Sequence, residues 1–493
     1  MEENAVFIGI DLGTSAVKLL LMTEDGKIRK IVSEEYPLSM PKPGWSEQNP
    51  QDWENAAISG LKKLLEGEKA ENVKGIGIGG QMHGLVALDA QDAVVRPAIL
   101  WNDGRTEEET AWLNESVGTE TLAKLSGNIA FAGFTAPKLL WMRKHEPERF
   151  ERIAKIMLPK DYLVYRLTGV HATDCSDASG MLLFDVEHRN WSKELTALCG
   201  LVPTQLAGVY ESYEPVGTLT KRAAEAVGLS EKVIVVAGAG DNAAAAVGTG
   251  TVGEGGCNIS LGTSGTVFIS GGQFVNPANH AIHSFCHADG GWHLMGVELS
   301  SASCNQWWAD ILGNRNFAAQ QAEIDENRLG VNPVLWLPYL MGERTPHNDA
   351  SARAAFWGMS MDSTRADMTQ AVLEGVAFGL KDALEGAKSA GVKVEVSRLC
   401  GGGAKSALWS KIIANVLGIR LEMLKTEQGP GLGGAMLAAV GCGAYQTVSE
   451  AADAIVEVSG SIVPERELTE RYALRYAEWK KLYPALRSVY AEK

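Results

Sequence analysis

Two short segments contain the residue types that bind phosphate. Residues 10–15 read I-D-L-G-T-S, and residues 259–264 read I-S-L-G-T-S. Phosphate is densely charged, so it is bound by hydroxyls and by backbone N–H groups that glycine allows to approach closely, and both segments supply these. Only the first carries a carboxylate, Asp11, which can hold Mg²⁺ through water. One copy alone would indicate an ordinary hairpin, whereas two copies favour a phosphate site.

A second carboxylate stands at a predicted junction between a strand and a helix. The apolar run 233–236 predicts a buried strand, Gly238 and Gly240 end it, and Asp241 follows where a helix would begin. Taken alone, Asp241 is best interpreted as a helix N-cap. The alternative is a carboxylate that faces an acceptor hydroxyl, because the helix N-terminus would keep it ionised and able to accept a proton at neutral pH.

Two further segments have side chains that suit a sugar. Gln81-Met82-His83-Gly84 and the loop 101–105 (W-N-D-G-R) each follow a strand-like run. Ligands of open α/β sheets bind at the carboxyl ends of strands, so we expect both segments there. The alternatives are that His83 is a loop histidine whose hydrogen bonds stay within the protein, and that Asp103 and Arg105 form a local ion pair. Residues 106–109 (T-E-E-E) predict a capping box that fixes the second loop.

A glycine cluster and a histidine-rich run complete the candidates. Gly401-Gly402-Gly403 follows the strand-like run 394–400 and precedes a predicted helix near 408–417, so its backbone could lie against adenine or phosphate, or serve close packing only. His280, His283, Cys286 and His287 lack the spacing of structural zinc sites, so we assign them to a strand and not to a metal.

The elements that must position these residues form two related halves. The two phosphate turns are 249 residues apart, and apolar, β-rich residues flank each. Strands and helices alternate within each half, with a helix predicted to start at Asn49-Pro50. An aromatic stripe at helical spacing near the C-terminus indicates core packing: Tyr472, Tyr476, Trp479, Tyr483. We therefore predict two mixed sheets covered by helices, with a boundary near residues 248–256.

Composition excludes several other classes of protein. The chain has 493 residues, 45% of them hydrophobic, and a net charge of −15. This charge argues against sequence-independent binding to nucleic acid or to an anionic membrane. Seven cysteines form no C-x-x-C pair, which favours a reducing compartment. The N-terminus does not resemble a signal peptide, and the apolar run 429–445 is too short to span a bilayer, so we expect a cytoplasmic protein.

Together these segments resemble the FGGY family of carbohydrate kinases over nearly the whole chain. Family-like patterns occur at residues 133–141 (GFTAPKLLW), 356–359 (FWGM) and 371–375 (AVLEG). The xylulokinase branch is indicated by residues 81–84, 101–105, 158–162 (LPKDY), 240–242 (GDN) and 342–347 (GERTPH).

The resemblance implies an α/β fold of two actin-like (ribonuclease H-like) domains with the active site in the cleft between them. Residues 1–250 would form the sugar and Mg-phosphate side, and residues 251–493 the nucleotide side. The implied reaction is ATP-dependent phosphorylation of D-xylulose in xylose catabolism. The two halves should close on the substrates. The oligomeric state is open, with a homodimer among the options.

The resemblance also implies residue roles. Asp241 would be the general base, Asp11 would lie at Mg²⁺ and the ATP phosphates, and the remaining positions divide between the substrates. The sugar would contact Met82, His83, Asp103, Arg105, Asp241 and Asn242; the nucleotide would contact Thr14, Ser15, Thr263, Gln306, Gly402 and Gly403. Ala239 departs from the glycine of many relatives, and it fits only if its φ is negative.

Two other functions stay open at this point. An actin-like ATPase without a small acceptor would keep the phosphate turns but would have no use for the loops 81–84 and 101–105. A sister kinase could act on ribulose, L-xylulose or a polyol, because sugars that differ at one carbon often share related pockets.

Overall fold

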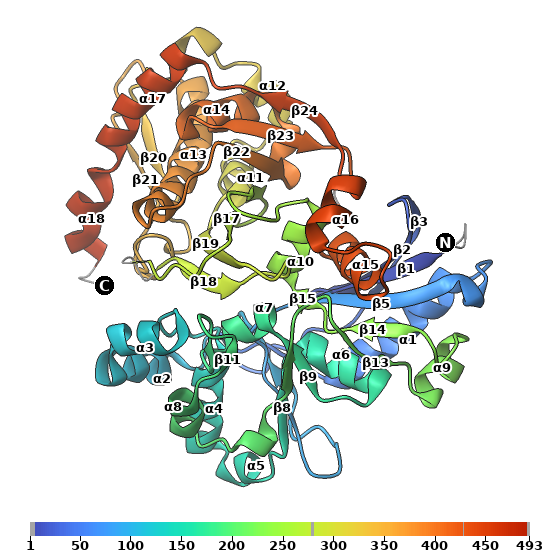
Figure 1. Cartoon of the computed structure of the whole chain (residues 1–493). Helices are drawn as coiled ribbons and strands as arrows, with labels where there is room; N and C mark the ends of the chain where they lie inside the picture. Colours follow the sequence, from blue (N-terminus) through green and yellow to red (C-terminus); the bar gives the residue numbers. More distant parts are fainter. Residues whose placement is uncertain (1–4, 278–280, 427, 491–493) are drawn as a thin grey trace.

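The computed structural model describes residues 5–277, 281–426 and 428–490. The chain forms two lobes, each built on one large mixed sheet. Figure 1 shows the N-terminal half, blue to green, below the C-terminal half, yellow to red.

The N-terminal sheet has the strand order β13-β14-β5-β1-β2-β3, and β15 pairs with β5. The strand β1 lies at its centre, antiparallel to β2 and parallel to β5. The strands of this sheet are β1 (Val6–Leu12), β2 (Ala16–Thr23), β3 (Ile28–Glu35), β5 (Val73–Gly80), β13 (Pro215–Thr218), β14 (Ile234–Val236) and β15 (Ala239–Gly240).

The C-terminal sheet has the order β18-β19-β17-β16-β22-β23-β24. Its central strand β16 is antiparallel to β17 and parallel to β22, so it repeats the surroundings of β1. The strands are β16 (Cys257–Leu261), β17 (Gly265–Gly271), β18 (His283–Cys286), β19 (Trp292–Glu298), β22 (Val396–Cys400), β23 (Arg420–Leu424) and β24 (Val458–Ile462). The predicted strand-turn-strand unit is therefore present in both halves. The prediction of a strand holds for residues 283–286 and is wrong for His287, which follows the strand, while His280 lies outside the described residues.

The alternation of side chains along β1 decides what each face of its sheet carries. Val6, Ile8, Ile10 and Leu12 enter a core with α1 (Pro50–Leu65) and α6 (Pro159–Thr168). The intervening residues, which end in Asp11, face the opposite side, as strand geometry requires. The helix α1 starts after Asn49, whose side chain accepts a hydrogen bond from the Gln51 N–H, as predicted.

The opposite face of the N-terminal sheet is covered by a helix from the C-terminal half. The helix α15 (Gly429–Gly441) packs on β1 and β5, beside α10 (Asp241–Gly248). Glycines make this approach possible: a Cβ on Gly9 would lie 1.8 Å from the Gly431 carbonyl oxygen, and one on Gly433 would lie 1.8 Å from the Ala244 carbonyl oxygen. Figure 1 shows α10, α15 and α16 (Val448–Ile455) where the two lobes meet.

The larger core belongs to the C-terminal lobe. The long helix α13 (Arg365–Ser389) packs on β17 and β19 and against α14 (Ala407–Leu417). The predicted aromatic stripe is buried there, on α17 (Arg466–Trp479) and α18 (Leu482–Tyr490). The prediction that this stripe packs in the core is confirmed.

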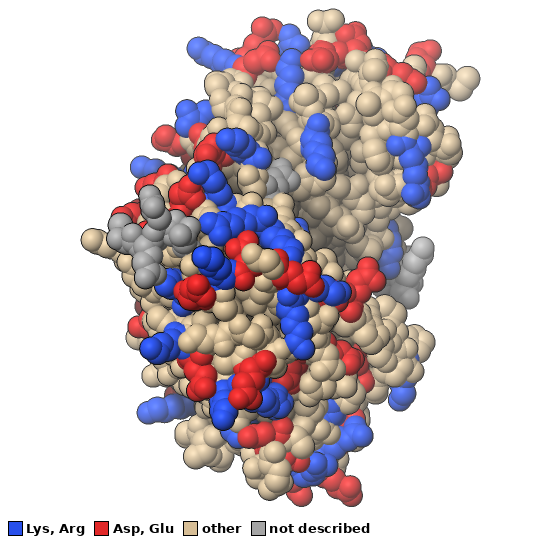
Figure 2. Space-filling view, turned by 90° about the vertical axis from the view of Figure 1, so that its right-hand side faces the viewer, with Lys and Arg blue, Asp and Glu red and all other residues tan. Residues whose placement is uncertain are grey.

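Basic and acidic side chains are mixed on the surface. Figure 2 shows Lys and Arg interspersed with Asp and Glu across the face in view. Among the described residues, no helix is long and apolar enough to cross a membrane.

Candidate active site

Asp11 and Asp241 reach the same edge of the N-terminal sheet. Asp11 is the last residue but one of β1, and Asp241 begins α10 directly after β15. Both β1 and β15 pair with the end of β5, because Leu12 and Gly240 are both register partners of Gly80. Parallel pairing therefore brings the two carboxylates together.

Asp241 does not cap α10. The helix has Gly240 at its N-cap, and no side-chain capping bond is formed. Instead, the Asp241 Oδ1 accepts hydrogen bonds from the backbone N–H (2.7 Å) and the side-chain amide (2.9 Å) of Asn242. The capping interpretation is therefore wrong, and the carboxylate lines a cavity.

The two carboxyl groups are harder to ionise than the sequence indicated. Burial, and next the charge of Asp11, raise the pKa of Asp241 to about 7. Burial raises the pKa of Asp11 to about 6, against the opposing charge of Lys18. The expected effect of the helix N-terminus on Asp241 is thus outweighed by burial and by a like charge.

Asp11 fits a magnesium ion. Its carboxylate makes no hydrogen bond or ion pair with any described residue, and a second carboxylate stands nearby on α10. Oxygen ligands of this kind are the ones that Mg²⁺ prefers. A cation here would also offset the repulsion that raises the pKa of Asp241.

The first phosphate turn is held from behind by three polar side chains. The Tyr36 hydroxyl donates to the Gly13 carbonyl oxygen, and the Gln48 side chain donates to that of Thr14 at 2.7 Å. Gln81 donates to the Gly13 carbonyl oxygen at 3.2 Å. The Thr14 hydroxyl accepts from the Trp101 Nε1–H at 3.0 Å. Ser15 is exposed at the tip of the turn.

The second turn lies beside the glycine cluster, because β16 and β22 run parallel to the same edge. Gly401 has φ 94°, and a Cβ on Gly403 would lie 2.4 Å from the Leu261 side chain. A Cβ on Gly402 would meet nothing within 4 Å. Thr263, Gly402 and Gly403 are therefore brought together.

The remaining nucleotide candidate lies on the next helix. α11 (Ala302–Ile311) starts under the second turn, with the Ala302 N–H donating to the Gly262 carbonyl oxygen at 2.8 Å. Gln306 is half-buried on this helix, and its amide donates to Asp310 at 3.1 Å.

Both halves line one cavity of about 250 Å³. Four predicted sugar contacts lie in its wall: Met82, His83, Asp241 and Asn242. The other lining residues are Trp101, Phe131, Gly133 and Phe134 from the first half and Ser264, Thr266, His283, Met295, Val297 and Arg344 from the second.

His83 is held in an unusual conformation. Its φ of 68° lies in the left-handed region, where a residue other than glycine is uncommon. Its carbonyl oxygen accepts from Thr135 (3.0 Å) and from the buried Lys138 (2.8 Å). Its Nδ1 donates to the Gly180 carbonyl oxygen at 2.8 Å, so Nε2 is left as an acceptor. Burial, and next Lys138, lower the pKa of His83 to about 3, so the ring is neutral.

Asp103 and Arg105 are not in the cavity wall. Their side chains pair at 2.6 and 2.8 Å, and Arg105 stacks over Trp45 at 3.7 Å. The geometry therefore favours the local ion pair, which fixes the loop that carries Trp101. The predicted capping box does not form, because the Thr106 hydroxyl donates to the Ala132 carbonyl oxygen instead.

A buried charged cluster stands behind Asp241. Lys160 pairs with Asp161 (2.5 Å) and Asp174 (2.8 Å). Burial opposes the charge of Lys160, but these carboxylates outweigh it and raise its pKa. Asp174 accepts from the Ser176 hydroxyl, whose oxygen accepts from the Gly240 N–H at 3.1 Å. The cluster thus fixes the backbone on which Asp241 stands.

The segment before Asp241 tolerates Ala239. The left-handed conformation falls on Gly238 (φ 78°), while Ala239 pairs with Gly79 in the sheet. This matches the conformation required for alanine.

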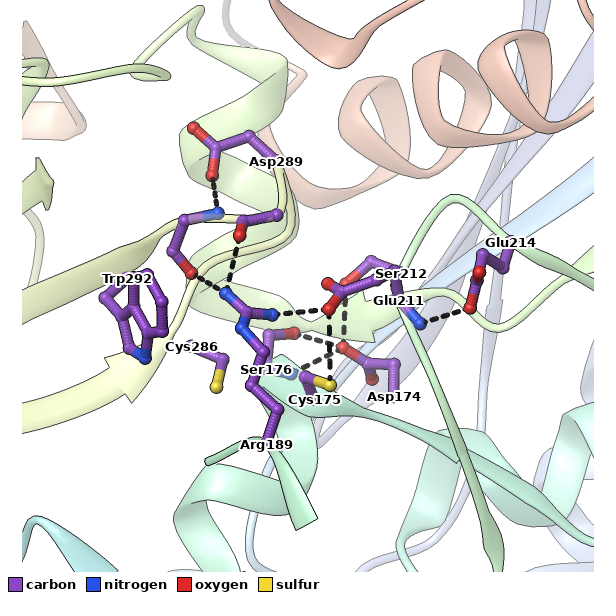
Figure 3. A network of polar contacts seen from close by, with 12 residues as sticks. Asp174, Cys175, Ser176, Arg189, Glu211, Ser212, Glu214, Cys286, Asp289 and Trp292 are labelled. Carbon is purple, nitrogen blue, oxygen red and sulfur yellow. Dashed lines mark hydrogen bonds and ion pairs between the residues drawn. The ribbon is translucent and has the colours of Figure 1, made fainter. Parts of the chain in front are cut away.

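Polar contacts fasten the two halves beside the cavity. Figure 3 shows Arg189 of the first half reaching Glu211 at 2.6 Å and the carbonyl oxygens of Gly290 (2.6 Å) and Gly291 of the second half. Its guanidinium also lies 4.5 Å from the Trp292 ring.

Backbone groups of β18 strengthen this junction. The Asn128 side chain exchanges two hydrogen bonds with the Ser284 backbone, at 2.8 and 3.1 Å. The Cys286 N–H donates to the Ser179 hydroxyl at 3.0 Å. The strand β18 is therefore held on the first half while it pairs with β19 of the second.

Sequence reasoning missed the contribution of the second half to the cavity. The sequence predicts a strand at His283 and places Arg344 in the motif 342–347, and neither pattern indicates a contact with the sugar. Phe131 stood just before a family-like pattern. The arginine of the motif 342–347 is the available signal, but nothing in the sequence places it opposite Asp241.

The fold and the site define a carbohydrate kinase. Residues 6–248 match the N-terminal domain of the FGGY family of carbohydrate kinases, and residues 257–442 match its C-terminal domain. The chain therefore belongs to this family, and it is a phosphotransferase with ATP as co-substrate. The predicted α/β fold of two domains is confirmed, in an arrangement consistent with the actin-like class.

Individual relatives cover almost the whole chain. The xylulose kinase of Escherichia coli (strain K12) is 41% identical over 98% of this chain and 99% of its own length. That of Bacillus subtilis (strain 168) is 37% identical over 97% of this chain and 96% of its own. The crystal structure of a xyloylose kinase from Brucella ovis has a TM-score of 0.93 and 40% identity, covering 98% of this chain and all of that one.

Proposed function

We propose that this enzyme transfers the γ-phosphate of ATP to a hydroxyl of D-xylulose. The full-length similarity to xylulose kinases at 37–41% identity supports the acceptor. The observation that carries the chemistry is the cavity lined by Asp241, because it offers a half-buried carboxylate in the same wall as Ser264 of the second phosphate turn.

In this proposal Asp241 accepts the proton of the attacking hydroxyl. Its pKa of about 7 matches a group that exchanges protons near neutral pH. Asn242 holds Oδ1 through two hydrogen bonds, so the carboxylate is oriented before the sugar arrives. Met82 and His83 would contact the sugar, and the His83 Nε2 would accept from a sugar hydroxyl.

Asp11 would hold Mg²⁺, and the two turns would bind ATP. The ion, when bound, supplies positive charge that neutralises the phosphates. Thr14 and Ser15 face them from the first half, and Thr263, Gln306, Gly402 and Gly403 line the nucleotide side of the second. We place the reaction in the cytoplasm, where the free thiols of this chain would stay reduced.

The proposal is tested by ADP release over a panel of pentuloses, polyols and aldoses. We expect little ATP turnover without sugar and the highest kcat/KM with D-xylulose. Turnover that is independent of sugar would favour the actin-like ATPase, and a better acceptor in the panel would reassign the substrate. Small-angle scattering should give a smaller radius of gyration with ATP analogue and sugar bound than without them.

A further inference from the structure

Arg344 is a cation without a partner in the wall of the cavity. Its guanidinium makes no hydrogen bond or ion pair within the described parts of the chain, and it lies 5.2 Å from the Phe131 ring. A guanidinium has five N–H donors and no acceptor. Arg344 is half-buried, so part of its hydration is lost without a protein partner in return, and a ligand that brings oxygen acceptors would pair with it.

The loop that carries Arg344 is rigid. The Arg344 N–H donates to the Glu343 carboxylate at 2.7 Å, and the Thr345 N–H donates to the Val297 carbonyl oxygen at 3.0 Å. The Thr345 hydroxyl also donates to the Ala281 carbonyl oxygen at 2.7 Å. The side chain is therefore presented from a fixed backbone.

The polar groups in the cavity wall differ in what they can exchange with a ligand: Ser264, Thr266 and His283 can donate and accept, whereas a few groups can do only one of these. The first half offers the Asp241 carboxylate and the His83 Nε2, which both need hydroxyl donors. The second half offers the Arg344 guanidinium, which can only donate. A carbonyl oxygen has two lone pairs and no proton, so it matches the donors of Arg344 directly, whereas a polyol hydroxyl beside Arg344 must also find an acceptor for its own proton.

We propose that Arg344 recognises the carbonyl oxygen of a 2-ketose and thereby selects ketoses over the corresponding polyols. The inference rests on the proposed function and deepens it, because it assigns the hydroxyketone end of the acceptor to the second half. The phosphorylated hydroxyl then lies at the other end, beside Asp241. Phe131 and His283 pack edge-to-face on each other in the wall of the cavity, with ring centroids 4.9 Å apart, and give this end an aromatic lining.

The test compares D-xylulose with xylitol and D-arabinitol, the two polyols that differ from it only at carbon 2. For Arg344→Met we expect kcat/KM with D-xylulose to fall about 10²-fold, mainly through KM, and the polyol values to change less than threefold. Arg344→Lys should restore part of the lost kcat/KM, because lysine keeps the positive charge but lacks the planar set of N–H donors of a guanidinium. Calorimetric titration with D-xylulose alone should show the same loss of affinity.

Arg353→Met is the matched control. Arg353 is exposed nine residues further on and, among the residues described, donates to the carbonyl oxygens of Ala350 and Ala352 alone. Arg353→Met should leave the ratio of kcat/KM for D-xylulose to kcat/KM for the polyols unchanged. Thermal melting of Arg344→Met should match or exceed that of the parent, because removing an unpaired cation loses no described hydrogen bond or ion pair.

Two outcomes would overturn the assignment, and they are distinguishable. The first outcome is a parent enzyme that uses D-xylulose and an Arg344→Met variant whose kcat/KM falls equally for all three acceptors, or for none. In that case only the proposed role of Arg344 fails. If the parent enzyme prefers the polyols, the proposed acceptor fails as well.

Discussion

The two halves share one sheet plan but use its central strand differently. The last two residues of β1 before the phosphate turn are Asp11 and Leu12, and the equivalent residues of β16 are Ser260 and Leu261. Two residues earlier, Gly9 lies under α15, whereas its equivalent Asn258 carries a side chain that bonds to Thr249. The same backbone therefore supports a carboxylate site in one half and a neutral binding edge in the other.

This difference shows where the chemistry is concentrated. The N-terminal sheet, α10 and α15 meet through glycine contacts too close for any side chain, so Asp11 and Asp241 stand on one rigid unit. The C-terminal half contributes the second turn, the glycine cluster and the donor side of the cavity.

Replacing the first-half base should have the largest effect. Asp241→Asn keeps the shape and the hydrogen bonds from Asn242 but removes the proton acceptor. We expect turnover to fall about 10²–10⁴-fold with little change in the KM for sugar, measured by coupled ADP release. Near-normal turnover would remove Asp241 from the role of base.

The comparison of the two turns gives the next effect. Asp11→Ala should lower kcat/KM for Mg-ATP by about 10²-fold and weaken the dependence on Mg²⁺, since a carboxylate at a metal-phosphate site contributes several kcal/mol. Ser260→Ala at the equivalent position should lower it by no more than about fivefold, because a neutral hydroxyl contributes about 1 kcal/mol or less. Equal losses would contradict the functional asymmetry of the halves.

The packing difference predicts a stability effect. Gly9→Ala puts a Cβ 1.8 Å from the Gly431 oxygen, so overpacking should cost about 1–3 kcal/mol or more in the free energy of unfolding. Asn258→Ala removes only side-chain hydrogen bonds and should cost about 1 kcal/mol. Urea denaturation of both variants measures this, and a tolerated Gly9→Ala would show that α15 can shift away from the sheet.

The smallest effect concerns pH. Asp241 must be ionised to act as a base, and its pKa is about 7, so kcat/KM should fall about tenfold per unit as the pH drops below that value. Asp11 raises this pKa by its negative charge, so Asp11→Asn should move the acid limb to lower pH. Ser260→Ala should leave the limb in place. An acid limb that moves to higher pH in Asp11→Asn would contradict the electrostatic coupling of the two carboxylates.

Much of the scaffold could be predicted from sequence because its signals are local. The repeated turns predicted the shared strand-turn-strand unit, and the glycine-ended run before Asp241 predicted the start of α10. The interactions of Asp103 and Arg105 were harder to judge, because their partner Glu47 and the stacking Trp45 lie far away in the sequence.

The electrostatics of the site needed the fold itself. The sequence showed Asp241 at a helix start, where a low pKa is expected, but burial and the approach of Asp11 depend on the pairing of β1, β5 and β15. The place of Arg344 likewise depends on how the second lobe lies on the first, and no local pattern encodes that.

The position of α15 has a consequence for dividing the gene. A fragment that ends near residue 250 would lack the helix that covers Gly9, Gly77 and Gly79, and would leave a glycine-lined sheet face open to water. The complementary fragment would carry an apolar helix with nothing to cover: Leu432, Met436 and Leu437 are all buried against the first half. The two halves, although related by repetition, should therefore fold only in each other's presence, and separately produced fragments should gain activity only when they are expressed together.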